Sequence, residues 1–284
     1  MKILVTGATG FTGKHFLSIA RAAGHEVVPL KANLTDAAAV ESEILGVCPS
    51  AVVHLAGISF VAHLNASDFY SVHVVGSTNL LNALSRLTMA PDRILLASSA
   101  AVYGNVRTYP IEETQIPAPA SHYATSKVAM EWMARTFDDR LPIVIARPFN
   151  YTGWGQSLDF VIPKIVSHFA RRAPVLELGN LHVEREYNDV RTVCRTYLAL
   201  LEKGLAGEVY NVCSGVPYSL ELVIGLLGDL TNHRLEVRVN PIFVRENEVH
   251  RSCGSAVKQD LCVGTVDRPT LTDTLRWMLQ TACD

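Results

Sequence analysis

Residues 1–13 read MKILVTGATGFTG, and this stretch decides the fold of the chain. The segment Lys2–Thr6 is rich in Ile, Leu and Val, which is typical of a short buried strand. Gly7, Gly10 and Gly13 follow at a spacing of three residues and lead into an apolar pattern with helical periodicity. A strand, a glycine turn and a helix in this order form a cradle for a dinucleotide, because free N–H groups at the start of the helix face its phosphates. The opening residues therefore predict a nucleotide-binding βα unit.

Each glycine of this turn has a separate task. Gly7 allows a turn with positive φ, Gly10 lets the backbone approach a pyrophosphate, and Gly13 lets the helix lie close to the strand. Ordinary glycine-rich turns can have the same pattern, but the strand before it and the helix after it favour the cradle. The spacing G-x-x-G-x-x-G resembles that of the extended branch of the short-chain dehydrogenase/reductase superfamily. The resemblance implies a nicotinamide coenzyme held by Gly7, Thr9, Gly10, Phe11, Thr12 and Gly13.

The composition argues against several classes of protein. The chain has 284 residues and a formal net charge of -2, with no basic stripe for nucleic acid and no apolar run of membrane-spanning length. The first predicted strand begins at once, so we expect no signal peptide. The six cysteines form no C-x-x-C pair, and the ten histidines show no H-x-x-x-H spacing. These features predict a cytoplasmic protein with reduced thiols and no metal site.

Predicted strands and helices alternate over the first half of the chain, which indicates an α/β fold with a doubly wound parallel sheet of the Rossmann type. We expect strands at 2–6, 26–30, 51–55, 93–98 and 142–146, and helices at 11–24, 37–45, 67–87 and 121–137. The rhythm then loosens, with strands expected at 175–178, 208–212 and 235–239 and helices at 160–170, 220–230 and 271–279. We expect a dinucleotide-binding domain at 1–150, onto which a helix at 189–203 packs back, and a smaller α/β substrate-binding lobe at 151–284.

The end of the second predicted strand bears on the choice of coenzyme. An acidic residue at this place usually binds the hydroxyls of the adenosine ribose. This chain has Lys31 there, and a lysine can pair with a 2′-phosphate. We therefore expect NADP, with NADPH favoured over NAD and NADH, and a solvated lysine on a loop is the alternative. The resemblance implies further coenzyme contacts from Asn33, Leu34, Leu55, Ala56, Gly57, Tyr123, Lys127 and Pro148.

Three residues suit hydride chemistry at a carbonyl. Tyr123 and Lys127 are four residues apart in a predicted helix and so share one of its faces, and Ser99 follows a predicted strand. A tyrosine with a pKa of ~10 is a poor base at neutral pH, and a nearby ammonium favours its phenolate form. Ser99 would hydrogen-bond the reacting oxygen while Tyr123 exchanges a proton with it.

The glycine turn, the segment SSAAVYG and the Y-x-x-x-K pair together resemble extended short-chain dehydrogenases over nearly the whole chain. Ser99, Tyr123 and Lys127 fall on the catalytic positions of that family. Its dehydratases often carry acids directly after the serine, whereas Ala100 and Ala101 stand here and cannot act as acid or base. The resemblance therefore implies reduction of a ketone or 4-epimerisation in place of dehydration.

One helix departs from the family pattern N-x-x-G-T-x-N-L-L. His73 replaces the first Asn, and Ser77 replaces the Thr. A proton relay through the first position would be altered here, and a residue that only fills space against the next strand is the alternative.

Four segments resemble the sugar-nucleotide enzymes of the family, in particular its GDP-sugar dehydratases and reductases. RPFNYTGWGQ resembles a turn that contacts the diphosphate or the sugar, and FVIPKI resembles the base-binding helix. GNLHVEREYNDV and VRENEVHR contain arginines suited to phosphate and a glutamate suited to ribose hydroxyls. The substrate contacts implied are Ser59, Ser99, Asn150, Lys164, Gly179, Asn180, Arg185, Arg245 and Glu248.

We expect a reductase that passes hydride from NADPH, or NADH, to carbon 4 of a GDP-4-keto-6-deoxyhexose, with Tyr123 as the proton donor. The product would be GDP-rhamnose or its carbon-4 epimer GDP-6-deoxytalose, and the spacing does not distinguish these two. A nucleotide-sugar 4-epimerase that retains its NAD is the enzymatic alternative, and a non-catalytic dinucleotide-binding sensor is the third. The resemblance also implies a homodimer built on the helices at 67–87 and 121–137.

Overall fold

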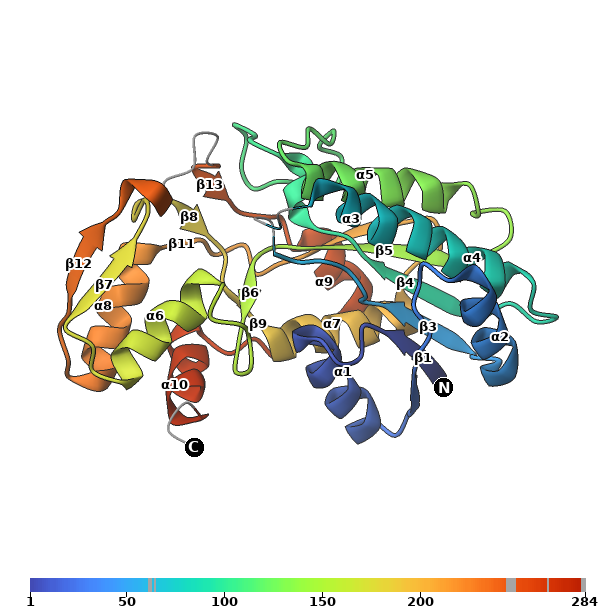
Figure 1. The fold of residues 1–284 in the computed structure, drawn as a ribbon, viewed down its shortest axis with the longest axis horizontal. Helices are drawn as coiled ribbons and strands as arrows, with labels where there is room; N and C mark the ends of the chain where they lie inside the picture. Colours follow the sequence, from blue (N-terminus) through green and yellow to red (C-terminus); the bar gives the residue numbers. More distant parts are fainter. Residues whose placement is uncertain (61–62, 64, 244–248, 265, 282–284) are drawn as a thin grey trace.

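Six parallel strands form the central sheet of the computed structural model, in the order β10-β5-β4-β3-β1-β2 (Figure 1). The structure describes residues 1–60, 63, 65–243, 249–264 and 266–281. Every neighbouring pair of strands is parallel, and the order reverses between β1 and β3. The predicted doubly wound sheet is thus confirmed. Its strands are β1 (Lys2–Thr6), β2 (Glu26–Pro29), β3 (Ala51–His54), β4 (Arg93–Ala97), β5 (Ile143–Pro148) and β10 (Val209–Val212).

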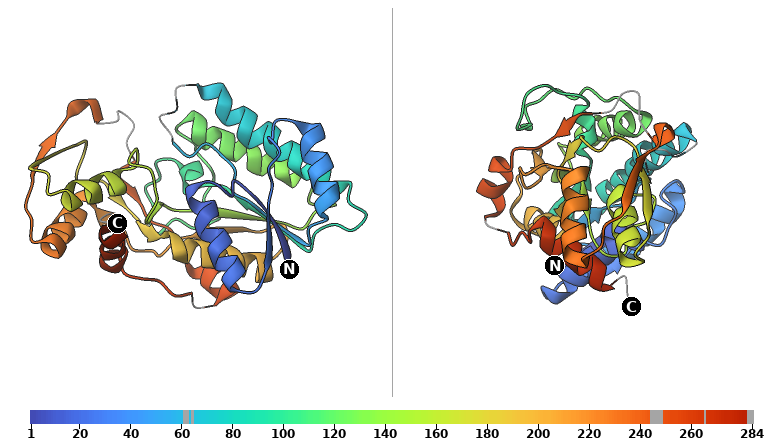
Figure 2. Two further views of the ribbon diagram at one scale, coloured as in Figure 1. Left: turned by 60° about the horizontal axis from the view of Figure 1, so that its bottom comes forward. Right: turned by 90° about the vertical axis from the view of Figure 1, so that its left-hand side faces the viewer.

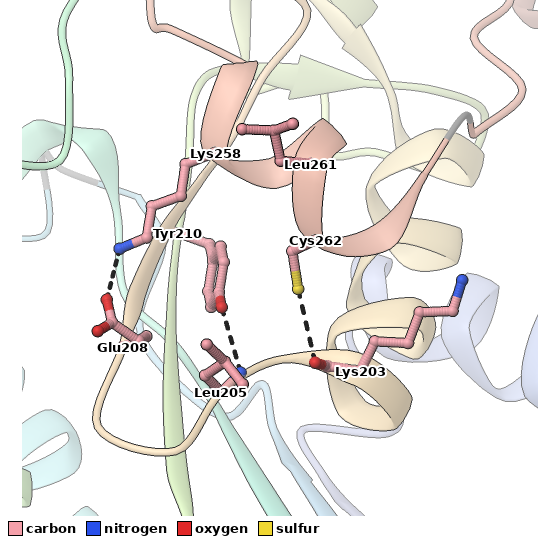
Figure 3. Close-up of a pocket in the computed structure, with 7 residues that line it drawn as sticks. All are labelled: Lys203, Leu205, Glu208, Tyr210, Lys258, Leu261 and Cys262. Carbon is pink, nitrogen blue, oxygen red and sulfur yellow. Dashed lines mark hydrogen bonds and ion pairs between the residues drawn. The ribbon is translucent and has the colours of Figure 1, made fainter.

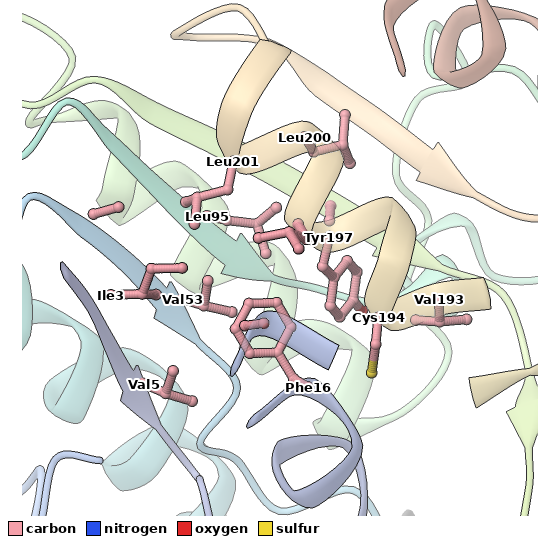
Figure 4. Close-up of a cluster of buried hydrophobic side chains, with 14 of the residues drawn as sticks. Ile3, Val5, Phe16, Val53, Leu95, Val193, Cys194, Tyr197, Leu200 and Leu201 are labelled. Atoms are coloured by element: carbon pink, nitrogen blue, oxygen red, sulfur yellow. The ribbon is translucent and has the colours of Figure 1, made fainter. Parts of the chain in front are cut away.

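Helices cover both faces of the sheet, so alternate residues of one strand enter different cores. Ile3 and Val5 point into the core under α1 and α7, whereas Leu4 points into the core beside α2 and α4. Figure 4 shows the first core, in which Phe16 of α1 and Tyr197 of α7 meet the strands. The helices are α1 (Phe11–Ala22), α7 (Val190–Lys203) and α9 (Val257–Val263) on one face and α2 (Ala37–Val47), α4 (Ser77–Ser85) and α5 (His122–Arg135) on the other. None of the helices in the described part of the chain is long and apolar enough to cross a membrane.

The segment predicted as one helix over 67–87 is divided into three parts. α3 (Ala66–Tyr70) and α4 are joined by a π-helical turn, η1 (Ser71–Gly76). A π-helical turn differs from an α-helix in its i→i+5 backbone hydrogen bonds, which the residue types at 71–76 do not indicate. The turn carries His73, which is fully buried between the helix and the rest of the domain.

The strand expected at 208–212 in the substrate lobe is instead the sixth strand of the central sheet. β10 pairs in parallel with β5, and all four of its residues are buried. α7, which precedes it, packs on the same sheet. The second half of the chain therefore contributes to the central sheet as well as to a smaller lobe, which its loosened rhythm did not indicate.

The smaller lobe lies beside the sheet, at the left of Figure 1, and faces the viewer in the right panel of Figure 2. It has a hydrophobic core of its own, which includes Ile165, Leu176, Val223 and Leu275. Its larger elements are α6 (Val161–Ala170), β7 (Val175–Leu178), α8 (Leu220–Thr231), β12 (Glu236–Val239) and α10 (Leu271–Thr281). The shorter elements of the chain are η2 (Ala100–Tyr103), β6 (Tyr151–Thr152), β8 (Glu184–Arg185), β9 (Asn188–Asp189), β11 (Tyr218–Ser219), η3 (Pro241–Phe243) and β13 (Arg251–Ser252).

The turn after β1 depends on close contacts between glycine and backbone. Gly7 has a φ of +68°, and a Cβ added to it would lie 2.6 Å from the nitrogen of Ala56. A Cβ on Gly13 would lie 2.2 Å from the oxygen of Gly7 and 2.7 Å from the Cα of Ala8. α1 consequently begins directly against the end of β1, with its first N–H groups at the carboxyl edge of the sheet.

We expect Gly13→Ala to destabilise the protein by about 1–3 kcal/mol, because the added methyl group must push backbone atoms apart. Gly46→Ala is the matched control, since a Cβ on Gly46 in α2 would meet nothing within 4 Å. That control should be neutral or more stable by up to about 1 kcal/mol. Chemical denaturation followed by circular dichroism measures both changes. Equal denaturation midpoints for Gly13→Ala and the wild type would contradict the tight contact.

Candidate active site

The candidate active site lies at the carboxyl edge of the central sheet. Parallel sheets bind ligands beyond this edge, at the point where the strand order reverses. β1 and β3 are neighbours at that point, and Thr6 Oγ1 accepts a hydrogen bond from the nitrogen of Ala56 at 3.0 Å. The glycine turn after β1 and the motif at 55–57 after β3 therefore form one continuous surface.

Ser99, Tyr123 and Lys127 converge at this edge. Ser99 follows β4, and its Oγ accepts a hydrogen bond from the nitrogen of Ala101 at 3.1 Å. Tyr123 and Lys127 lie one turn apart on α5, and Ser99 lies close enough to Tyr123 to affect the pKa of its hydroxyl. Lys127 Nζ donates to the oxygen of Ala97 at 2.9 Å. The structure thus brings together the three residues predicted to carry the chemistry.

The protonation of this group follows from its burial. Burial raises the pKa of Tyr123 above its ordinary value, and a hydrogen bond from Ser99 opposes the rise. Burial lowers the pKa of Lys127 to about 8, and the carboxylate of Glu131 opposes the fall. At neutral pH the site thus holds a phenol that keeps its proton, one helical turn from an ammonium. Such a pair suits donation of a proton from Tyr123 to the oxygen of a ligand.

His73 ties the loop after β3 to the helix that carries Tyr123. Its Nε2 accepts from the nitrogen of Ile58 at 3.0 Å, which places the ring proton on Nδ1, 2.8 Å from Ser126 Oγ. Burial and the charge of Lys127 lower the pKa of His73 to about 2, so the ring is neutral. It also meets the ring of Tyr123 edge to face, with the centroids 5.8 Å apart. The residue that departs from the family pattern therefore does more than fill space.

His54, to which the sequence assigned no chemical role, is a bonded core residue. Its two ring nitrogens lie 2.7 Å from Thr6 Oγ1 and 2.8 Å from Ser77 Oγ. Burial and the charge of Lys127 lower its pKa to about 3. His54 is therefore neutral and joins β1, β3 and α4 underneath the site.

A buried ion pair lies behind the three residues, and the sequence analysis missed it. Arg147 donates to both carboxylate oxygens of Glu131, from Nε at 2.9 Å and from Nη2 at 2.6 Å. Ser98 Oγ also donates to Glu131, and Tyr103 accepts from Arg147 at 3.0 Å. Tyr103 in turn donates to Asn211 Oδ1 at 2.7 Å. These five residues are at most 5% exposed, and they join α5 to β4, β5 and β10.

Two signals in the sequence could have revealed this network. Glu131 lies four residues after Lys127, so it occupies the next turn on the same face of the helix. Arg147 stands at the end of an otherwise apolar strand, and a buried arginine requires an anionic partner.

The first turn of α1 contacts the segment that leads into the smaller lobe. Thr12 Oγ1 lies 2.8 Å from the hydroxyl of Tyr151, and the rings of Phe11 and Tyr151 are stacked with their centroids 6.1 Å apart. Burial raises the pKa of Tyr151, so its hydroxyl stays protonated. Phe11 and Thr12, predicted to contact the coenzyme, are thus held in place by Tyr151, which the sequence did not single out.

The segment after β2 forms the turn that was predicted to hold the adenosine. Asn33 Oδ1 accepts from the nitrogen and the hydroxyl of Thr35 at 3.1 and 3.0 Å. Leu34 is buried, and its oxygen accepts from Asn79 Nδ2 at 2.8 Å. Lys31 is exposed, and its ammonium bonds to none of the residues that the structure describes. Its side chain is thus available to a phosphate.

The glycines around the site fit a nicotinamide coenzyme. A Cβ on Gly57 would lie 2.9 Å from His73 Nε2 and 3.5 Å from Lys127 Nζ, so the backbone itself approaches the ammonium. A Cβ on Gly10 would meet only the oxygen of Gly7 among the described atoms within 4 Å, which leaves the outer side of the turn open. Dinucleotide pyrophosphates bind to such a turn at the start of a helix. Pro148 is buried at the end of β5, on the same edge of the sheet.

Two of the residues predicted to bind substrate, Lys164 and Gly179, lie in the smaller lobe. Lys164 Nζ donates to the oxygen of Glu177 at 2.8 Å and lies 4.5 Å from the ring centroid of Phe243. Gly179 packs so closely on Phe243 that a Cβ would lie 2.4 Å from its oxygen. The structure therefore brings Lys164 and Gly179 together at one residue, Phe243, with Lys164 over its ring and Gly179 against its backbone, which the sequence analysis did not predict.

The other predicted substrate contacts are more widely spread. Arg185 on β8 donates to the oxygens of Glu184 and Val249, and Asn180 Oδ1 accepts from a backbone nitrogen two residues on. Asn150 and Ser59 are exposed near the carboxyl edge of the sheet. Arg245 and Glu248, also predicted to bind substrate, lie outside the described residues.

A pocket of about 440 Å³ lies at the opposite edge of the sheet (Figure 3). Glu208 lines it and directly precedes β10, whereas Ser99 follows the carboxyl end of β4, in the same parallel sheet. Lys258 Nζ pairs with Glu208 at 2.6 Å, and the thiol of Cys262 donates to the oxygen of Lys203. These lining groups are satisfied by one another, and the pocket is separate from the candidate site.

Comparison with known proteins finds relatives that match most of the chain. The model of the NAD dependent epimerase/dehydratase family matches residues 3–213. The GDP-6-deoxy-D-talose 4-dehydrogenase of Aggregatibacter actinomycetemcomitans is 34% identical over 263 residues, which cover 91% of this chain and 90% of the relative. The GDP-6-deoxy-D-mannose reductase of Pseudomonas aeruginosa is 35% identical over 294 residues, which cover 98% and 96% of the two chains. The structure of RMD from Pseudomonas aeruginosa complexed with NADPH has a TM-score of 0.91 at 33% identity and covers 99% of this chain and 97% of that one.

We expect Glu131→Gln to destabilise the protein by about 3–5 kcal/mol, because it leaves the guanidinium of Arg147 buried without an anion. Asp229→Asn breaks an exposed ion pair with Arg234 and should cost less than about 1 kcal/mol. The free energy of unfolding in urea measures both effects. The double variant Glu131→Met with Arg147→Met should recover much of the loss, since no buried charge remains. A Glu131→Gln variant as stable as the wild type would show that the ion pair of Glu131 and Arg147 does not hold the site together.

Proposed function

Because the chain belongs to the NAD dependent epimerase/dehydratase family, we propose that it reduces the 4-keto group of a GDP-4-keto-6-deoxyhexose. It is an NAD(P)-dependent sugar-nucleotide enzyme of the short-chain dehydrogenase/reductase superfamily, as its family match and its relatives show. The product of the proposed reaction is GDP-rhamnose or GDP-6-deoxytalose. We favour NADPH as the coenzyme, because the exposed Lys31 follows β2 and a relative of similar structure binds NADPH.

One arrangement carries the proposal: the hydroxyls of Ser99 and Tyr123 lie close together at the glycine edge of the sheet, and Tyr123 is one helical turn from Lys127. A keto oxygen that accepts from both hydroxyls would be held and polarised before reduction. Ala100 is buried and Ala101 is exposed directly after Ser99, and neither can protonate a leaving hydroxyl. The arrangement therefore supports exchange between ketone and alcohol and does not support loss of water.

The residues of the chain account for the protons of this reaction. A bound coenzyme would supply the hydride that carbon 4 receives. Tyr123 would give its phenolic proton to the carbon-4 oxygen, so that the carbonyl becomes an alcohol and a phenolate remains. Ser99 would donate a hydrogen bond to the same oxygen and stabilise its developing charge. The ammonium of Lys127, held by the oxygen of Ala97, would stabilise the phenolate until a proton from water replaces the one given away.

Residues of the smaller lobe suit the binding of a nucleotide sugar. Arg185 offers a cation for a diphosphate, and Lys164 lies on the helix expected to contact the base; both lie in the smaller lobe, away from the coenzyme turn. The two GDP-sugar relatives favour guanine as the base. We also infer a homodimer through α3–α4 and α5, since Val75 and Trp132 are 50% and 64% exposed along this helix pair.

A nucleotide-sugar 4-epimerase that retains its NAD is the rival function. It would use the same three residues but consume no coenzyme over a full turnover. A non-catalytic sensor would keep the glycine turn without needing Ser99, Tyr123 and Lys127 in register. Net consumption of free coenzyme separates the reductase from both.

We expect NADPH oxidation at 340 nm with a GDP-linked 4-keto-6-deoxyhexose, and weaker or no oxidation with the UDP- and dTDP-linked sugars. Tyr123→Phe should lower kcat by at least about 100-fold, because the proton donor is lost. Tyr70→Phe is the matched control, since Tyr70 is hydrogen-bonded to His122 on the exposed side of the same helix pair. Equal turnover by Tyr123→Phe and the wild type would contradict the catalytic assignment, and interconversion of sugars without coenzyme oxidation would favour the epimerase.

The reduction should slow as the pH rises through about 8, because Lys127 has its pKa lowered to about 8 and loses its charge there. The proton of Tyr123 is retained across this range, since burial raises its pKa. The loss of activity therefore comes from deprotonation of the Lys127 ammonium, and kcat/KM should fall on the alkaline side only. Measurement of kcat/KM at a series of pH values between 6 and 10 tests for this fall. A flat profile across pH 8 would show that the charge of Lys127 is not needed.

A further inference from the structure

A carboxylate from α2 reaches the turn after β2. Glu43 Oε1 accepts from the nitrogen of Lys31 at 2.9 Å, and its Oε2 accepts from the nitrogen of Ala32 at 2.8 Å. Glu43 is partly buried under this turn. The strand end itself lacks an acidic residue, so a residue twelve positions further along the chain brings the negative charge to this place.

This turn is where the adenosine ribose of a dinucleotide lies in a Rossmann fold. A carboxylate there accepts hydrogen bonds from a 2′-hydroxyl, and it repels a 2′-phosphate. Each oxygen of Glu43 has accepted one N–H and still has a free lone pair. The ammonium of Lys31 has the opposite preference, because it attracts a phosphate.

We propose that Glu43 is a specificity-determining residue that limits the preference of this enzyme for NADPH. This role of Glu43 rests on the proposed function, because it assumes that the adenosine of a nicotinamide coenzyme lies at the end of β2. In this view Lys31 and Glu43 act against each other on the same 2′ position. The wild-type protein therefore accepts both NADPH and NADH, and removal of either charge makes it selective.

The structure keeps Glu43 from turning away. Asp36 caps α2 by accepting from the nitrogen of Ala39 at 3.1 Å, and Asn33 closes the turn before it. The oxygen of Leu34 is held by Asn79 of α4. Hydrogen bonds thus hold the segment between β2 and α2 at its start and at its end. A 2′-phosphate bound at this turn would therefore lie near the carboxylate of Glu43. Of the charged side chains on these two segments, Lys31 alone is cationic.

The test measures the dissociation constants of NADPH and NADH for the full chain by coenzyme fluorescence. Glu43→Gln should raise the affinity for NADPH relative to NADH on the order of tenfold, because one unit charge close to a phosphate dianion is removed. Lys31→Met should change the ratio in the opposite direction. Glu41→Gln is the matched control, since Glu41 lies on the same helix but pairs with Arg86, the residue that follows α4. Its ratio should stay within about twofold of the wild type, because an exposed pair contributes little.

Two smaller ligands test whether Glu43 acts on the adenosine part of the coenzyme. Adenosine 2′,5′-bisphosphate should compete with the coenzyme better in Glu43→Gln than in the wild type, whereas 5′-AMP should gain no such advantage. The advantage should shrink at 1 M salt, where charges are screened within about 3 Å. An unchanged ratio, or a ratio that moves toward NADH in a folded Glu43→Gln variant, would overturn the proposal. Failure of the wild type to bind either coenzyme would instead overturn the proposed function.

Discussion

The structure of the site depends on one buried ammonium. Lys127 is 6% exposed, and a charge at this depth is costly unless the interior compensates for it. The oxygen of Ala97 accepts its hydrogen bond, and the carboxylate of Glu131 lies on the next turn of α5. Glu131 is shared with Arg147, so its charge compensates Lys127 only in part, and the pKa of Lys127 stays lowered. The interior behind the site is therefore arranged so that one cation can exist there and can also give up its proton.

The same charge explains why two histidines beneath the site are neutral. His54 and His73 both have their pKa lowered by burial and then by Lys127. A neutral imidazole can accept at one nitrogen and donate at the other, which is what the contacts with Thr6, Ser77 and Ile58 require. Protonation would turn an acceptor into a donor and break the bonds that hold the strand ends. The buried polar residues therefore fix the positions of the strand ends at the carboxyl edge of the sheet, in addition to setting the charge of the site.

The sequence predicted the parts of the protein that are local and missed those that depend on distant contacts. The strand, glycine turn and helix at the N-terminus could be predicted because Gly7 is required by its positive φ and Gly13 by backbone contacts within that unit. Ser99, Tyr123 and Lys127 could be predicted from a spacing and a family pattern, and the structure places them together. The pairing of β10 with β5 joins residues more than sixty positions apart, and no periodicity carries that information. The π-helical turn at 71–76 was missed for a similar reason, since its buried polar contacts are made with other elements.

Hydrogen bonds to backbone atoms join the smaller lobe to the segments that follow strands of the sheet, and this bears on how the site divides its tasks. Glu186 is fully buried, and its carboxylate accepts from the nitrogens of Ser214 and Gly254 at 2.7 Å each. The oxygen of Asn150 accepts from both the backbone nitrogen and the side-chain amide of Asn188, at 3.0 and 3.1 Å. These contacts fix the strands that face the sugar end without using the side chains predicted to bind it. The residues that select a substrate can therefore vary while Ser99 and the sheet edge keep their positions. On the proposed function, the sheet edge would transfer the proton, and we expect the residues of the lobe to decide which nucleotide sugar is bound.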